Sequence, residues 1–193
     1  HTQEEYAMRN EYENEAFFQQ YAQMSRSREG LSAAGEWHQL KPLFPPLEGK
    51  SVLDLGCGSG ILSIAALVLG ASHALAVDID PKAVDVAYEN AALNGIGKDR
   101  YTVRAGDVLS DAALAAEIAQ QRYPLVLANI VADVIIPLSA QVPNLLTEDG
   151  IFLCSGIIDT RAHEVEAALA KNGLKVTRKR EKNGWVALEA VLA

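Results

Sequence analysis

Short apolar runs alternate with helix-like patterns along most of the chain. Five runs of four or five residues have the length and the apolar side chains of buried strands. They span 51–55, 74–78, 101–105, 125–128 and 151–154. Strands that alternate with helices predict a parallel sheet with helices on both faces.

Between these runs, apolar positions recur every three or four residues, as in amphipathic helices. The expected helices run over 61–69, from Pro81 to a stop at 94–95, over 132–146, and from an Asp159 cap to 171–173. Asp80 before Pro81 is a preferred start of a helix. Pro137 and Pro143 are expected to make the third helix irregular.

The end of the chain predicts a hairpin. Residues 175–180 and 185–192 flank Asn183-Gly184, a pair favoured in two-residue hairpin turns. One strand of this hairpin must run antiparallel to the rest. The predicted fold is therefore α/β and Rossmann-like, with a seven-stranded, mostly parallel sheet, an antiparallel C-terminal hairpin and helices on both faces.

The first fifty residues differ from this pattern. Apolar side chains recur from Phe17 to Met24 at the spacing of one helix face, and the prolines within 42–46 stop regular structure. We therefore expect two parts, a helical cap over residues 1–50 and the main domain over residues 51–193.

Composition argues against several classes of protein. No apolar run reaches the roughly 18–20 residues of a membrane span, and the polar N-terminus does not resemble a signal peptide. Two cysteines among 193 residues cannot form a disulfide framework, so we expect a reducing, cytoplasmic setting. The formal charge of −8 argues against a general binder of nucleic-acid backbones. The histidines are too scattered for a metal site.

One glycine-rich motif points to chemistry. Gly56-x-Gly58-x-Gly60 lies between the first strand and the first helix, where a nucleotide-type ligand can approach the backbone closely. Asp78 ends the next strand, where a carboxylate accepts hydrogen bonds from ribose hydroxyls. Asp107 ends the third strand, where it could meet an adenine amino group. The glycine motif alone is weak evidence, because glycines also occur in ordinary tight turns. The two aspartates make the prediction of a nucleotide-type site more specific.

The spacing distinguishes between two nucleotide ligands. A dinucleotide site favours Gly-x-Gly-x-x-Gly/Ala, whereas Ile61 follows Gly60 here. Asp54, two residues before the first glycine, would repel a pyrophosphate. S-adenosylmethionine, which carries a sulfonium cation and no phosphate, is therefore favoured. A dinucleotide-dependent oxidoreductase is the alternative.

The same motifs are similar to those of a known family. Segments 54–60, 77–81 and 106–107 resemble motifs of class I methyltransferases. More narrowly, 58–66, 77–81, 89–95, 128–130 and 155–157 resemble the catalytic domain of the ribosomal protein L11 methyltransferases. That family trimethylates amino groups. The resemblance implies S-adenosylmethionine as cofactor, S-adenosylhomocysteine as product, and Asn129 as the catalytic residue that faces the methyl acceptor.

The resemblance also implies which residues contact the cofactor. They are Asp54, Gly56, Cys57, Gly58, Gly60, Asp78, Ile79, Asp107, Val108 and Asn129. Cys57 is expected to be a small loop residue and not a nucleophile, because methyl transfer needs none. Asn129 has a second interpretation, in which it only caps the turn that follows it.

Residues 1–50 resemble a different group, small class I methyltransferases taken to act on small molecules, which implies a mosaic chain. In their N-terminal cap, Tyr21 and Arg26 would close over the cofactor. In the alternative interpretation, Tyr21 is an ordinary aromatic residue on a helix face and Arg26 is a cation exposed to solvent. The recognition domain that usually precedes the catalytic domain has no counterpart in residues 1–50. We therefore expect the chain on its own to methylate the ribosomal protein poorly.

These observations together predict an S-adenosylmethionine-dependent methyltransferase that N-methylates a protein amino group by in-line transfer. A small-molecule methyltransferase and a cofactor-binding protein without turnover are the alternatives. The expected partner is the methyl acceptor, a protein or a small molecule, with no membrane and no strong nucleic-acid signal.

Overall fold

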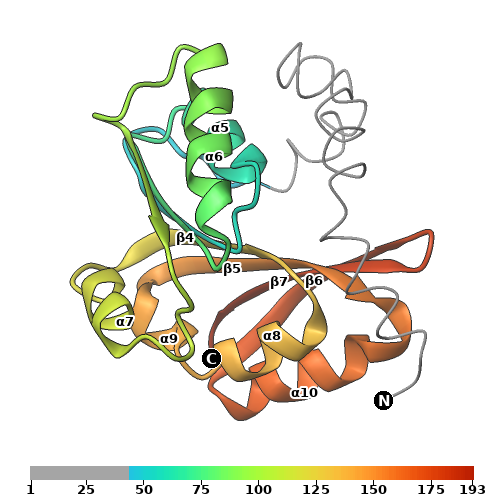
Figure 1. Ribbon diagram of the computed structural model, residues 1–193. Coiled ribbons are helices and arrows are strands. Elements are labelled where there is room, and N and C mark those ends of the chain that lie inside the picture. The colour runs from blue at the N-terminus through green and yellow to red at the C-terminus, as the bar shows by residue number, and fades with distance from the viewer. Residues whose placement is uncertain (1–43) are drawn as a thin grey trace, which may run out of the picture. The chain divides into compact units, whose positions relative to one another are not determined.

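A computed structural model describes residues 44–193, which form a sheet covered by helices (Figure 1). The predictions for Tyr21, Arg26 and the helical cap lie outside the described residues, apart from the last few positions of the cap. The strands are β1 (Ser51–Leu55), β2 (His73–Asp78), β3 (Tyr101–Ala105), β4 (Tyr123–Asn129), β5 (Leu146–Ile158), β6 (Leu174–Lys182) and β7 (Trp185–Leu192).

The strand order across the sheet is β3-β2-β1-β4-β5-β7-β6. β1 to β5 run parallel to one another, and β7 runs antiparallel between β5 and β6. The predicted seven-stranded, mostly parallel sheet is therefore confirmed. At the hairpin turn, Asn183 and Gly184 have φ of 53° and 78°, the two positive values that a type I′ turn requires.

Among the described residues, helices cover both faces of the sheet (Figure 1). α5 (Ile61–Val68) and α6 (Pro81–Leu93) lie on one face, and α7 (Ala112–Ile118), α8 (Ala132–Leu138), α9 (Val142–Leu145) and α10 (Ala162–Lys171) lie on the other. α5 and α6 confirm the first two predicted helices. None of the helices from residue 44 onward is long and apolar enough to cross a membrane.

The large core lies between the sheet and the second layer of helices. Val126 and Phe152 of the sheet pack in one cluster with Ile135 of α8 and Val165 of α10, and all four are fully buried. Removing apolar surface from water stabilises such a cluster by roughly 25 cal/mol per Å². The core thereby fixes the positions at which β4 and β5 end.

The third predicted helix is wrong as a single element. The segment 132–146 forms two helices, α8 and α9, with residues 139–141 between them. Pro143 falls in the first turn of α9, where its missing N–H costs nothing. In a continuous helix the same ring would meet the preceding turn and remove a hydrogen bond, so the chain restarts the helix at Val142.

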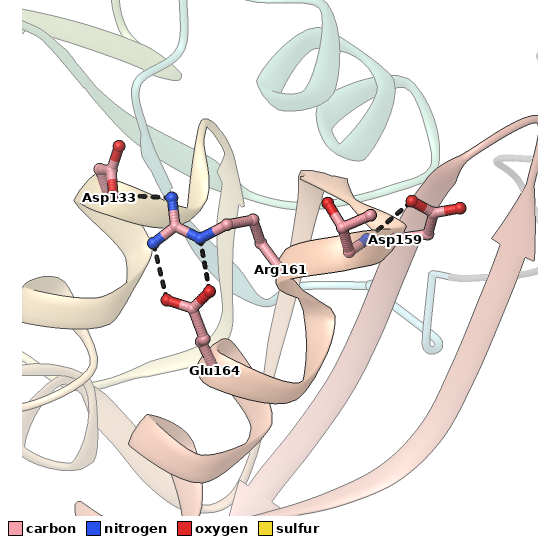
Figure 2. A network of polar contacts seen from close by, with 5 residues as sticks. Asp133, Asp159, Arg161 and Glu164 are labelled. Atoms are coloured by element: carbon pink, nitrogen blue, oxygen red, sulfur yellow. Dashed lines mark hydrogen bonds and ion pairs between the residues drawn. The ribbon is translucent and has the colours of Figure 1, made fainter. Parts of the chain in front are cut away.

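Asp159 does not cap α10, so this prediction is also wrong. A 3₁₀ turn, η3 (Asp159–Arg161), comes first, and the side chain of Asp159 accepts only the N–H of Thr160, at 2.7 Å (Figure 2). α10 begins at Ala162 without a side-chain cap. Arg161 instead binds both oxygens of Glu164 at 2.7 and 2.8 Å and Asp133 of α8 at 2.9 Å (Figure 2). This network joins the starts of α8 and α10.

β5 and α7 differ most from the prediction. β5 is predicted as 151–154 but extends over Leu146–Ile158. The prediction missed its start because residues 147–149 are polar and give no apolar run. α7 follows β3 in a segment for which the apolar pattern predicts no helix. Its start is defined by Asp111, whose Oδ1 accepts the N–H groups of Ala113 and Leu114, both at 3.0 Å.

The cap of α7 gives a test of the fold. Asp111→Ala leaves two N–H groups of the first turn without their acceptor and should lower the free energy of unfolding by about 1 kcal/mol. Asp111→Asn retains a side-chain oxygen and should lose much less. Urea denaturation of the full chain measures both, and equal stability of the parent and the alanine variant would contradict the cap.

Candidate functional site

The predicted site residues meet at one edge of the sheet, where the parallel strands end. β1, β2, β3 and β4 end at Leu55, Asp78, Ala105 and Asn129, and the loops that follow carry the remaining candidates. β1 and β4 are neighbours whose following helices cover opposite faces of the sheet. In open α/β sheets, this switch point is where ligands bind.

Asp54 is the buried charge beneath this edge. Its side chain, 1% exposed, extends from β1 to the first turn of α5. There its Oδ2 accepts the N–H of Ser63 at 3.1 Å and also the Ser63 hydroxyl. Gly60, which precedes the helix, offers no side-chain cap, so a residue of the neighbouring strand supplies the acceptor. The carboxylate therefore occupies the positive end of α5.

The environment of Asp54 changes its protonation. Desolvation by burial raises the pKa of the carboxyl from 3.8 to about 6, although the two hydrogen bonds from Ser63 act in the opposite direction. Its other oxygen, Oδ1, is buried and has no hydrogen-bond partner among the described residues. Burial also raises the pKa of the nearby Cys57 thiol, which is 6% exposed. A thiol of this kind is a poor nucleophile.

The glycines of the loop after β1 each have a positive φ, of 75° at Gly56, 50° at Gly58 and 80° at Gly60. Their surroundings differ. A Cβ on Gly60 would lie 2.6 Å from the hydroxyl of Tyr101, and one on Gly56 would overlap Ile130. A Cβ on Gly58 would meet nothing within 4 Å. The loop is thus packed at both ends and open at Gly58.

Asp78 holds the open part of this loop. Its Oδ2 accepts the N–H of Gly58 at 2.7 Å, and its Oδ1 accepts the N–H of Asp80 at 2.9 Å. The Asp78 carbonyl accepts the N–H of Gly106 at 2.8 Å, which joins the loop after β3 to the same residue. Beside Asp78, Ile79 is 72% exposed, unusual for a large apolar side chain.

Asp107 shapes the turn after β3. Its Oδ1 accepts the N–H of Leu109 at 2.9 Å, and its Oδ2 accepts the Ser110 hydroxyl at 2.8 Å. Val108 is half-buried against the core, and its carbonyl accepts from Gln141 at 3.3 Å. The structure therefore places Asp107 and Val108 on a defined turn at the same edge as Asp78.

Asn129 lies exposed at the end of β4. Its Oδ1 accepts the hydroxyl of Ser155, the residue opposite it on β5, at 3.0 Å. The next N–H, that of Ile130, binds the Ser155 carbonyl at 3.1 Å. Because Ile130 also packs on Gly56, Asn129 is connected to the glycine loop through one residue.

The edge is acidic. Asp54, Asp78, Asp80 and Asp107 lie there, and the short connections that follow β1 to β4 contain no lysine or arginine. A phosphate would meet only like charge on these side chains, whereas a cation would be attracted. Residues 44–193 hold no group of three His, Cys, Asp or Glu side chains that could ligate a metal. A cavity of about 630 Å³ among these residues lies toward the opposite strand ends, beside Ser51, His73 and Tyr123.

Sequence reasoning did not assign a role to several residues that shape the site. Ser63 pairs with Asp54, and Asn90 of α6 donates to the Ser59 carbonyl at 2.9 Å. Ser155 pairs with Asn129. Each of these lies within a segment already noted for its resemblance to known motifs, but only the folded chain shows which atoms they contact.

Comparison with known proteins identifies related chains. A family model of ribosomal protein L11 methyltransferase (PrmA) matches residues 44–192. The ribosomal protein L11 methyltransferase of Agathobacter rectalis is 40% identical over 155 residues, which cover 78% of this chain and 48% of the relative. That of Desulfitobacterium hafniense is 48% identical over 139 residues, which cover 72% and 42%. The chain spans about half the length of these curated relatives, or less.

Solved structures give the same picture. The ribosomal protein L11 methylase of Lactobacillus delbrueckii subsp. bulgaricus is 33% identical, with a TM-score of 0.67 over 86% of this chain and 76% of that one. A TehB-like SAM-dependent methyltransferase of Corynebacterium glutamicum, 20% identical, has a TM-score of 0.66 over 93% and 100%. The second likeness concerns the fold alone.

The buried carboxyl of Asp54 predicts a pH dependence of stability. With its pKa at about 6 in the folded chain and near 3.8 when unfolded, the folded state binds more protons between about pH 4 and 6. The free energy of unfolding should therefore fall as pH rises through this window, by up to about 3 kcal/mol from this group. Asp54→Asn, neutral at every pH, should remove that fall.

Urea denaturation at several pH values measures this effect as the difference between parent and variant. Asp85→Asn, at an exposed position of α6, is the matched control and should retain the pH dependence of the parent. An Asp54→Asn profile parallel to that of the parent would show that Asp54 has an ordinary pKa.

Proposed function

Because the chain belongs to the ribosomal protein L11 methyltransferase (PrmA) family, we propose that it transfers methyl groups from S-adenosylmethionine to an amino group of a protein. The family resemblance expected from the motifs is confirmed over residues 44–192.

The observation that carries this proposal is the carboxylate of Asp54 at the start of α5. In dinucleotide-binding folds, the pyrophosphate of the ligand takes the corresponding place at the helix N-terminus. Here the chain's own anion takes it, and an added phosphate would meet a second negative charge. This arrangement favours a nucleoside ligand that lacks phosphate and carries a positive charge, as S-adenosylmethionine does.

The remaining contacts fit the same ligand. Each oxygen of Asp78 accepts one backbone N–H and retains a second lone pair, which suits a pair of ribose hydroxyls. We assign the exposed side chain of Ile79 and the turn at 107–108 to the adenine. The open space at Gly58 allows close approach to the backbone, and Asp54, Gly56, Cys57 and Gly60 form the floor beneath it.

The acceptor side is built around Asn129. When bound, S-adenosylmethionine supplies a methyl group already activated by the sulfonium charge, so position and exclusion of water matter more than a base. We infer that the Asn129 amide holds the acceptor nitrogen. Apolar neighbours, Ile130 and the 58% exposed Val131, would favour the neutral amine that can attack. No Asp, Glu or His of the described residues hydrogen-bonds Asn129.

The family name suggests ribosomal protein L11 as the acceptor. Asn129 is exposed among the described residues, so a protein segment can reach it. Two alternatives remain, a small-molecule methyltransferase and a protein that binds the cofactor without turnover. The experiments below distinguish them from the proposed function.

Binding of the cofactor is the first test. Calorimetry of the full chain should detect S-adenosylmethionine and S-adenosylhomocysteine but not NAD. Asp78→Ala removes the ribose contacts and the Gly58 support, and should weaken binding by on the order of 1–3 kcal/mol. Asp85→Ala removes an exposed carboxylate of α6 and should bind like the parent. Unchanged affinity in Asp78→Ala, or tight binding of NAD, would refute the assignment.

Turnover is the second test. With S-adenosylmethionine and purified ribosomal protein L11, the chain should release S-adenosylhomocysteine and add methyl groups, as mass spectrometry detects. The rate should be low, because the usual recognition domain has no counterpart in residues 1–50. Asn129→Ala should lower kcat/KM by about 10- to 100-fold, the range expected for a lost positioning hydrogen bond. Asn144→Ala, at an exposed position of α9, is the matched control. Cofactor binding without product release would instead support a binding protein.

A further inference from the structure

A bulge in β5 lies directly beside Asn129. From Leu125 and Ile151 onward, β5 pairs with β4 without interruption up to Asn129 and Ser155. Its register with β7, however, shifts between Cys154 and Ile157. Gly156, inside the shift, has φ of 78°. Bulges re-aim a side chain at the price of one local irregularity, and they are frequent next to active sites. Here the residue at the bulge is Ser155.

The bulge fits closely against the loop after β4. A Cβ on Gly156 would lie 3.0 Å from Asn129 Oδ1 and 3.0 Å from the Ile130 carbonyl oxygen. The N–H of Ile130 donates to the Ser155 carbonyl at 3.1 Å. The backbone of the loop is therefore held by the sheet ladder and by this additional bond, without any help from the Ser155 side chain.

The Ser155 hydroxyl adds a different constraint. It donates to Asn129 Oδ1 at 3.0 Å, and Asn129 has no other side-chain partner in the described part of the chain. With Oδ1 accepting from Ser155, the two Nδ2 donors have no hydrogen-bond partner among the described residues, and one lone pair of Oδ1 stays free. An exposed asparagine without this bond would sample several orientations of its amide.

We propose that Ser155 is a positioning residue that fixes the orientation of the Asn129 amide toward the acceptor nitrogen. This inference rests on the function proposed above, because it assigns Ser155 to the acceptor side of that site. The bond contributes orientation and not loop position, since backbone contacts already supply the latter. Its loss should therefore affect the methyl-transfer step more than the binding of the cofactor.

Two substitutions at one position test this. Ser155→Ala deletes the hydroxyl, and Ser155→Thr retains it with a side chain that strands favour. With ribosomal protein L11 and S-adenosylmethionine, Ser155→Ala should lower kcat about tenfold, the equivalent of one net hydrogen bond. KM for the protein and Kd for S-adenosylhomocysteine should stay close to the parent values. Ser155→Thr should recover most of kcat.

Thr177→Val is the matched control, because it deletes an exposed hydroxyl that binds Glu189 on β7, on strands that carry none of the predicted site residues. Its kcat should equal that of the parent. Equal kcat in the parent and Ser155→Ala would overturn the proposal. So would an equal loss in Ser155→Ala and Ser155→Thr, which would indicate a packing role.

A second readout does not depend on turnover. In a ¹H–¹⁵N spectrum of the full chain, the side-chain amide signals of Asn129 can be identified by their loss in Asn129→Ala. Ser155→Ala should shift them and speed their exchange with water, and Ser155→Thr should not. If the parent binds S-adenosylmethionine but methylates nothing, the proposed function fails. Unchanged Asn129 signals in Ser155→Ala would overturn the present inference even then, and shifted signals would support it.

Discussion

The contact between the Asp54 carboxylate and the first turn of α5 is the constraint on which the rest of the site depends. It joins the end of a buried strand to the start of a helix, and the glycine loop spans the gap. The carboxyl is costly, because desolvation outweighs both hydrogen bonds and raises its pKa to about 6. Stability alone does not explain such a group in the core, whereas attraction for the cationic ligand that we propose does.

From that loop, two sets of contacts extend in opposite directions across the sheet. On one side Gly58 binds Asp78, whose carbonyl binds Gly106, so the turns after β2 and β3 are fixed to the loop. On the other side Gly56 packs on Ile130, which is bound to Ser155. A ligand at the loop is therefore surrounded by segments whose positions depend on one another.

The sequence predicted the parallel strands and the hairpin because buried strands are apolar throughout and Asn183-Gly184 has few other uses. The sequence-based prediction was wrong where the local pattern of polar and apolar residues does not match the element that forms. The start of β5 is polar, and the helix over 132–146 is divided at a proline that starts a new turn. Asp159 resembles a cap, but its side chain accepts only the N–H of Thr160. Local patterns do not report the tertiary contacts that decide these cases.

In the candidate site, too, the positions of residues could be predicted from the sequence but their atomic contacts could not. Strand ends are sufficient to place Asp78 and Asp107 at one edge, because parallel strands must end together, whereas Asn129 was assigned through the resemblance to known motifs. Which atoms pair could not be derived, since Asp54 meets Ser63 and Asn129 meets Ser155 only after strands and helices have packed. The proposed cofactor side is thus determined mainly by backbone geometry, which motifs report well. The proposed acceptor side depends on a single side-chain bond across two strands, and there motifs alone leave the chemistry undefined.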